Sequence, residues 1–87
     1  RIRNTGDPAV YHMEARETLP PGMEYVPGTT RWRKGAGPWQ NGRDPTITGN
    51  IWTGYTLKWT EEEVPGLAEL RSRQTLEIEF LRAEILK

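Results

Sequence analysis

Residues 17–32 read ETLPPGMEYVPGTTRW, and prolines and glycines stand on both sides of the short apolar piece Met23–Val26. A helix does not tolerate this punctuation, because proline lacks the backbone N–H that a helix needs and glycine loosens the chain. Proline and glycine are instead typical of strand ends and turns. The stretch therefore predicts two turns that bracket one short strand.

Alternation of apolar and polar residues predicts further strands on both sides of this stretch. The period of two runs from Ala9 to about Leu19, and it returns over 29–34 and over 51–59. Residues 35–50 are rich in glycine and proline, which favours a loop with a brief extended piece at 46–48. Residues 1–4 are expected to be the tail of a strand, followed by a turn at 5–8.

The last third of the chain supports two interpretations. Leu67, Leu70, Ile78, Leu81 and Ile85 fall near a heptad spacing, which favours a helix that could drive oligomerisation. Residues 76–80, however, alternate strictly between apolar and acidic side chains, which favours a strand. The alternation slips at 80–81, where we expect a β-bulge. We prefer the strand.

The length, charge and composition of the chain limit the classes of protein to which it can belong. The chain has 87 residues, enough for a single domain spanning 1–87. Its 12 basic and 12 acidic side chains cancel, which argues against non-specific binding to nucleic acid. No apolar run approaches the ~20 residues that cross a bilayer, so we expect no membrane span. Cysteine is absent, which excludes disulfides and thiolate metal sites.

These patterns predict an all-β fold of short strands joined by turns. One apolar interior is expected to be shared by side chains from most of the strands. The predicted core residues are Tyr11, Met13, Ala15, Tyr25, Leu57, Trp59, Leu76, Ile78 and Phe80.

Several short motifs occur in the order seen in one known family. They are Ile2-Arg3-Asn4-Thr5-Gly6, Glu17-Thr18-Leu19-Pro20-Pro21-Gly22, Tyr25-Val26-Pro27-Gly28-Thr29, Leu57-Lys58-Trp59, Pro65-Gly66 and Gln74-Thr75-Leu76-Glu77-Ile78. In this respect the chain resembles the DUF11-type conserved repeat domain of prokaryotic cell-surface proteins. Three features depart from that pattern: a first strand is missing, Glu17 stands where Asp is common, and residues 35–44 form a longer loop.

The resemblance implies an immunoglobulin-like, antiparallel β-sandwich, which we expect to have six or seven short strands. It also implies a non-catalytic structural or adhesive module, extracellular or at the cell surface, without a cofactor. Its expected partners are neighbouring modules or other surface components. Because the chain opens at Arg1 on strand-like residues, we expect it to be a piece of a longer multi-module protein. The missing strand would leave an open sheet edge, through which two copies could form a homo-oligomer.

The alternative function is that of a carbohydrate-binding module. Exposed aromatic rings flanked by amides and carboxylates are typical of sugar sites, and the possible ligand contacts are Trp32, Trp39, Gln40, Asn41 and Asp44. A structural interpretation of the same residues places Trp52 and Trp59 in the core and uses Trp32 and Trp39 to cover one end of the sandwich.

Other chemistries have little support in the sequence. The basic and aromatic residues 31–34 are explained by charges on the solvent side of a strand. The carboxylates lack the alternating spacing of a calcium loop. His12 is the sole histidine, which excludes a two-histidine metal site. We therefore expect no catalytic residues, no metal ligands and no enzyme activity.

Overall fold

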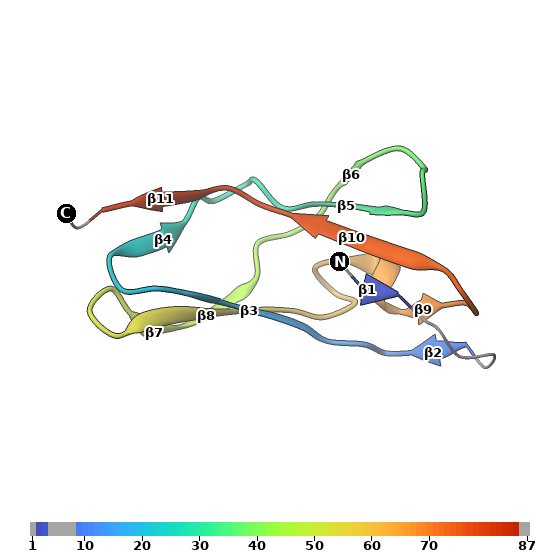
Figure 1. Ribbon diagram of the computed structural model, residues 1–87, viewed down its shortest axis with the longest axis horizontal. Coiled ribbons are helices and arrows are strands. Elements are labelled where there is room, and N and C mark those ends of the chain that lie inside the picture. The colour runs from blue at the N-terminus through green and yellow to red at the C-terminus, as the bar shows by residue number, and fades with distance from the viewer. Residues whose placement is uncertain (1, 4–8, 86–87) are drawn as a thin grey trace.

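The structure, a computed structural model, describes residues 2–3 and 9–85. Short strands dominate it (Figure 1). Their bounds are β1 Ile2–Arg3, β2 Val10–Tyr11, β3 Ala15–Leu19, β4 Met23–Tyr25, β5 Arg31–Lys34, β6 Gln40–Asn41, β7 Thr46–Asn50, β8 Gly54–Trp59, β9 Glu69–Leu70, β10 Thr75–Glu79 and β11 Arg82–Glu84. One turn of 3-10 helix, η1, covers Pro65–Leu67.

The strands form two facing layers (Figure 1). One layer holds the sheet β1-β10-β5-β6 and the pair β11-β4, and the other holds the sheet β3-β8-β7 and the pair β2-β9. Every strand pair is antiparallel. The molecule is elongated, with extents of 45 × 22 × 19 Å. The predicted all-β sandwich is confirmed.

The stretch 17–32 folds as its punctuation predicts. Strand β4 lies between two turns, and Gly22 and Gly28 have φ angles of 87° and 78°, which side chains with a Cβ rarely adopt. The turn expected at 5–8 and the Asn-Thr-Gly motif lie outside the described residues.

The strand predicted over 9–19 breaks at His12, whose φ is +51°. Before the break, Val10 stands opposite the buried Leu70, and Tyr11 stands opposite Glu69. The kink therefore changes which of the alternating side chains, the odd-numbered or the even-numbered ones, lie on the side of the interior. Tyr11 is 59% exposed, and its assignment to the core was wrong.

The strand interpretation of the C-terminal third is confirmed, and the helix alternative is wrong. The slip at Phe80-Leu81 is a change of partner rather than the expected β-bulge. Strand β10 pairs with β5, and after two residues β11 pairs with β4. Breaks of this kind explain why the described residues form eleven strands instead of six or seven.

The core confirms the burial of Tyr25, Leu57, Trp59 and Leu76, and four other predicted residues pack against it half-buried: Met13, Ala15, Ile78 and Phe80. The other members of the buried hydrophobic core, all outside the predicted set, are Leu19, Trp32, Val64, Leu67 and Leu70. Val64, Leu67 and Leu70 come from the connection 60–70, where no strand-like alternation indicates burial.

Gly66 explains how that connection packs so closely. A Cβ on Gly66 would lie 2.8 Å from the Trp32 ring and 2.9 Å from a Leu76 methyl carbon. Only glycine allows η1 to lie against β5 and β10 at this distance. The Pro65-Gly66 pair therefore acts as a packing site as well as a turn.

Trp52 does not belong to the core. Strand β8 begins at Gly54, and residues 51–53 form the turn that precedes it. The Asn50 side-chain oxygen accepts hydrogen bonds of 2.9 Å from the backbone N–H groups of Trp52 and Thr53, which fixes this turn. Trp52 is 72% exposed as a result.

Candidate ligand-contact site

The predicted ligand contacts lie on and beside one hairpin, formed by β5 and β6. Arg31 stands opposite Asn41, and Trp32 stands opposite Gln40. Trp39 immediately precedes β6 and is half-buried, whereas Gln40 and Asn41 are exposed. Four of the five predicted residues thus lie on the hairpin or in its connecting loop, and Asp44 follows it.

The outer face of this hairpin is an ordered set of charges around the Trp39 ring. The guanidinium carbons of Arg31 and Arg33 lie 5.1 Å and 4.5 Å from the ring centroid. Each arginine also pairs across to β10, Arg31 with Glu79 and Arg33 with Glu77, the latter at 3.2 Å. Cation–π contacts and cross-strand ion pairs therefore hold Trp39 in place.

Trp32 has a different role from Trp39. Its side chain faces the interior at 8% exposure, so it cannot stack on a ligand. Its indole Nε1 is buried without a hydrogen-bond partner among the described residues. Lys34, at the end of the same strand, donates a 2.7 Å hydrogen bond to the Glu69 carbonyl. The three cations of residues 31–34 thus each have an acceptor or ion-pair partner within the fold.

Asp44 is the end of a hydrogen-bond chain that starts in the core. The Trp59 Nε1 donates to Thr30 Oγ1 at 3.1 Å, and Thr30 Oγ1 lies 2.6 Å from the Tyr25 hydroxyl. The Tyr25 hydroxyl donates to Asp44 Oδ1 at 2.8 Å, so the Thr30 hydroxyl must donate to Tyr25. Asp44 Oδ1 also accepts the Gly28 N–H at 2.8 Å. This carboxylate ties two loops together.

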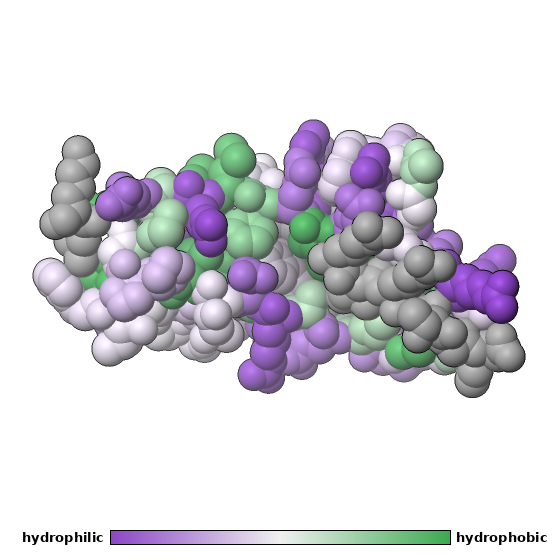
Figure 2. All heavy atoms as spheres, in the orientation of Figure 1, coloured by the Kyte–Doolittle hydropathy of each residue, from purple (hydrophilic) through white to green (hydrophobic). Residues whose placement is uncertain are grey.

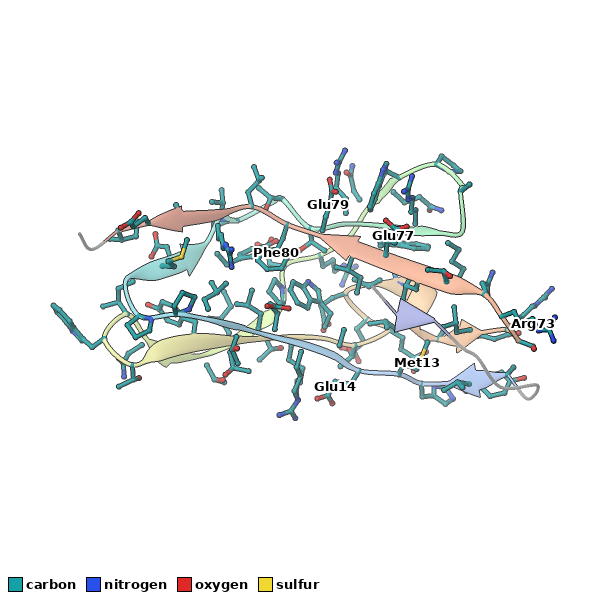
Figure 3. The ribbon with its side chains drawn as sticks, in the orientation of Figure 1. Met13, Glu14, Arg73, Glu77, Glu79 and Phe80 are labelled. Atoms are coloured by element: carbon teal, nitrogen blue, oxygen red, sulfur yellow. The ribbon has the colours of Figure 1, made fainter. Side chains whose placement is uncertain are left out.

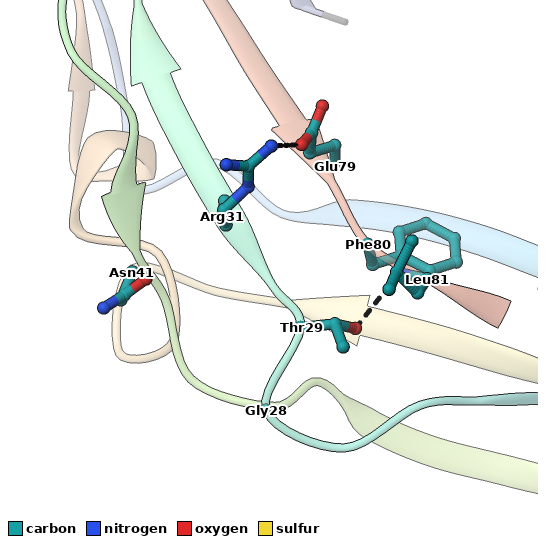
Figure 4. Close-up of a pocket in the computed structure, with 7 residues that line it drawn as sticks. All are labelled: Gly28, Thr29, Arg31, Asn41, Glu79, Phe80 and Leu81. Carbon is teal, nitrogen blue, oxygen red and sulfur yellow. Dashed lines mark hydrogen bonds and ion pairs between the residues drawn. The ribbon is translucent and has the colours of Figure 1, made fainter.

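A pocket of about 380 Å³ opens next to the hairpin (Figure 4). Arg31 and Asn41 line it from the hairpin, and Gly28, Thr29, Glu79, Phe80 and Leu81 complete the wall. Thr29 Oγ1 accepts the Leu81 N–H at 3.0 Å, which holds the crossing between β10 and β11 against the turn. The pocket wall thus combines the Asn41 amide, the Arg31–Glu79 ion pair and the apolar side chains of Phe80 and Leu81.

The structure therefore divides the five predicted residues. Trp39, Gln40 and Asn41 are accessible, Trp32 is buried, and Asp44 is exposed but engaged in the chain from Tyr25. Sequence reasoning missed Glu79, Phe80 and Leu81 as pocket residues. The break in the apolar–polar alternation at 80–81 is the sequence signal that could have indicated this position.

Two searches of the described residues bear on other kinds of site. Within 2–3 and 9–85, histidine, aspartate and glutamate side chains form no group of three or more that could hold a metal ion. No helix in the same part of the chain is long and apolar enough to cross a membrane.

Comparison of the chain with protein-family models, with curated proteins and with solved structures found no match.

Proposed function

We propose that this chain is a non-catalytic, immunoglobulin-like module of an extracellular or cell-surface protein, with a structural or adhesive role. The elongated antiparallel sandwich, 45 Å long and 22 × 19 Å across, is the observation that carries the proposal. Such a shape suits a spacer whose contacts are made by strand edges and end loops. The motifs that resemble the DUF11-type repeat support the same role.

Strand β7 supports contact between two copies of the chain. It pairs with β8 on one side, and no strand among the described residues covers its other side. All five of its residues are exposed and uncharged. Natural edges are usually protected by charges or proline, so an uncharged edge favours pairing with another strand. Antiparallel pairing of β7 with its own copy satisfies two-fold symmetry.

Sedimentation velocity over a range of protein concentrations tests this contact. The wild-type chain should self-associate, and Thr48→Lys should weaken association because it sets like charges near each other across the symmetric pair. Thr18→Lys is the matched control, since Thr18 and Thr48 flank Thr56 in one row across the same sheet. A folded monomer at high concentration would contradict the contact.

The location requires a separate experiment. Antibodies raised against the purified chain should label intact, unpermeabilised cells of the source organism. Labelling that appears only after permeabilisation would contradict the cell-surface assignment and leave the edge contact standing.

Carbohydrate binding is a second candidate, favoured by Trp39 and Asn41 next to the pocket of Figure 4. If a sugar stacks on Trp39, adding polysaccharide should shift the tryptophan fluorescence, and Trp39→Ala should abolish that shift. Trp52→Ala is the control, because Trp52 is exposed elsewhere on the molecule. A shift that survives Trp39→Ala would contradict this candidate.

A further inference from the structure

The outer face of the sheet β3-β8-β7 carries two rows of polar side chains. Leu57 and Trp59 of β8 are buried in the core, so the residues that alternate with them point away from it. Figure 2 shows hydrophilic surface along the lower edge of the molecule, below the middle of β3. The register sets three side chains in each row of this outer face: Arg16, Lys58 and Thr46 in one, and Thr18, Thr56 and Thr48 in the other.

The threonine hydroxyls of the outer face are not used within the described fold. Elsewhere such hydroxyls have internal partners: Thr30 Oγ1 accepts the Trp59 Nε1–H, and Thr60 Oγ1 donates to Glu63. No side-chain hydrogen bond to another described residue is made by the four threonines of the outer face, Thr18, Thr46, Thr48 and Thr56. Each of these hydroxyls therefore keeps a donor for a ligand.

The charges of the outer face leave a positive excess. Lys58 forms no ion pair with any described residue, whereas Arg16 donates a 2.5 Å hydrogen bond to Glu14. Figure 3 shows Glu14 on the outer side of β3. The hydrogen bond from Arg16, together with the positive charges of Arg16 and Lys58, lowers the pKa of Glu14. These two cations and one carboxylate sum to a single positive charge.

A hollow of about 160 Å³ lies on the outer face, where the two rows meet. Its lining residues are Arg16, Thr46, Thr48, Thr56 and Lys58. The hollow thus presents two cationic groups and three hydroxyl donors, the groups that form charge-assisted hydrogen bonds to an oxyanion. Its five lining residues include no aromatic ring on which a base could stack.

We propose that the outer face binds sulfate esters of an extracellular polysaccharide, with the ester between Lys58 and Arg16 and the threonine hydroxyls bonded to sulfate and sugar oxygens. A sulfate ester carries a single negative charge, which matches the positive excess of the face, whereas a phosphate monoester carries about −1.5 to −2 at pH 7. Nucleic acid fits less well, because its bases find no aromatic ring here. The inference rests on the proposed adhesive role and names the surface component that the module holds.

Isothermal titration calorimetry with the intact chain tests the proposal, with dextran sulfate as the probe and unmodified dextran as its uncharged control. Dextran sulfate should bind, and dextran should not. Lys58→Gln should weaken the binding about fivefold or more, as expected from the loss of one charge pair at the surface. Arg73→Gln removes an equal charge at the turn between β9 and β10 (Figure 3), outside the hollow, and should leave the affinity unchanged.

Glu14→Gln should act in the opposite direction. It removes the carboxylate that engages Arg16, so dextran sulfate should bind about threefold tighter or more, a gain that misfolding cannot produce.

Four results would overturn the proposal: no binding of dextran sulfate, equal binding of dextran, equal losses with Lys58→Gln and Arg73→Gln, or no gain with Glu14→Gln. A single-stranded oligonucleotide that binds as tightly as dextran sulfate would identify a phosphodiester polymer as the ligand and would also overturn it. Each of these results leaves the labelling of intact cells and the β7 contact unaffected, so failure of the proposed function is detected separately.

Discussion

Asp44 Oδ1 lies 2.8 Å from the Tyr25 hydroxyl, and this single contact joins the loop after β6 to the strand between the two proline-glycine turns. The same Tyr25 hydroxyl accepts the Thr30 N–H at 3.1 Å. A residue whose type and position suggest ligand binding is therefore part of the scaffold.

Tyr25→Phe should lower the free energy of unfolding by about 1–3 kcal/mol, because it leaves the buried Thr30 N–H without its acceptor. Urea denaturation followed by circular dichroism measures the change. Tyr11→Phe, at an exposed position, serves as control and should change the midpoint little. Equal effects of the two substitutions would show that the chain from Trp59 to Asp44 does not stabilise the fold.

Trp59→Ala should cost about 3–5 kcal/mol, because the ring is fully buried and packs on Phe80 with centroids 5.3 Å apart. Trp52→Ala should change stability by less than about 0.5 kcal/mol, because that ring projects from a turn into solvent. Thermal unfolding of the two variants compares them directly. A mild effect at Trp59 would contradict the assigned core.

Gly66→Ala should destabilise the domain, although alanine normally stabilises a helical turn relative to glycine. The new methyl group would meet the Trp32 ring at 2.8 Å, and overpacking of this kind costs about 1–3 kcal/mol. Chemical denaturation measures the loss. An increase in stability would mean that η1 lies farther from β5 than the structure shows.

Arg16→Gln should raise the pKa of Glu14 towards its ordinary value. The hydrogen bond from Arg16 is the main reason that the pKa of Glu14 is lowered in the folded chain. A depressed folded pKa gives stabilisation that is complete above the unfolded pKa and is lost as the pH falls through the folded pKa. Titration of the carboxyl carbon by NMR measures the pKa. Arg71→Gln, which breaks the separate pair with Glu69, should leave it unchanged.

The sequence pattern predicts which segments form strands better than it predicts where a strand is interrupted. Strict alternation over 76–80 identifies β10, because apolar residues at every second position must face one interior. The same reasoning misplaces Tyr11, because a positive φ at His12 changes which side chains face the interior, and histidine adopts positive φ too rarely for the residue type to predict it. Backbone kinks at ordinary residues are set by packing, here by the backbone hydrogen bonds from His12 and Met13 to Ala68 and Leu67.

The candidate site is predicted only in part for a related reason. Composition indicates an aromatic and amide cluster around Trp39, and the hairpin assembles it. Composition cannot tell an outward-facing tryptophan from an inward-facing one, and the Trp32 ring lies inward, close to Gly66.

The change of partner between β10 and β11 has a mechanical consequence. Strand β11 lies alongside β4 near one tip of the long axis (Figure 1), closed by hydrogen bonds from Val26 N–H to the Leu81 carbonyl and from Ile85 N–H to the Gly22 carbonyl. A pull on Ile85 along that axis loads these bonds in shear, so they must rupture together rather than unzip in turn. The pairing of β11 with β4 would then resist tension until these hydrogen bonds break, before the hydrophobic core unfolds.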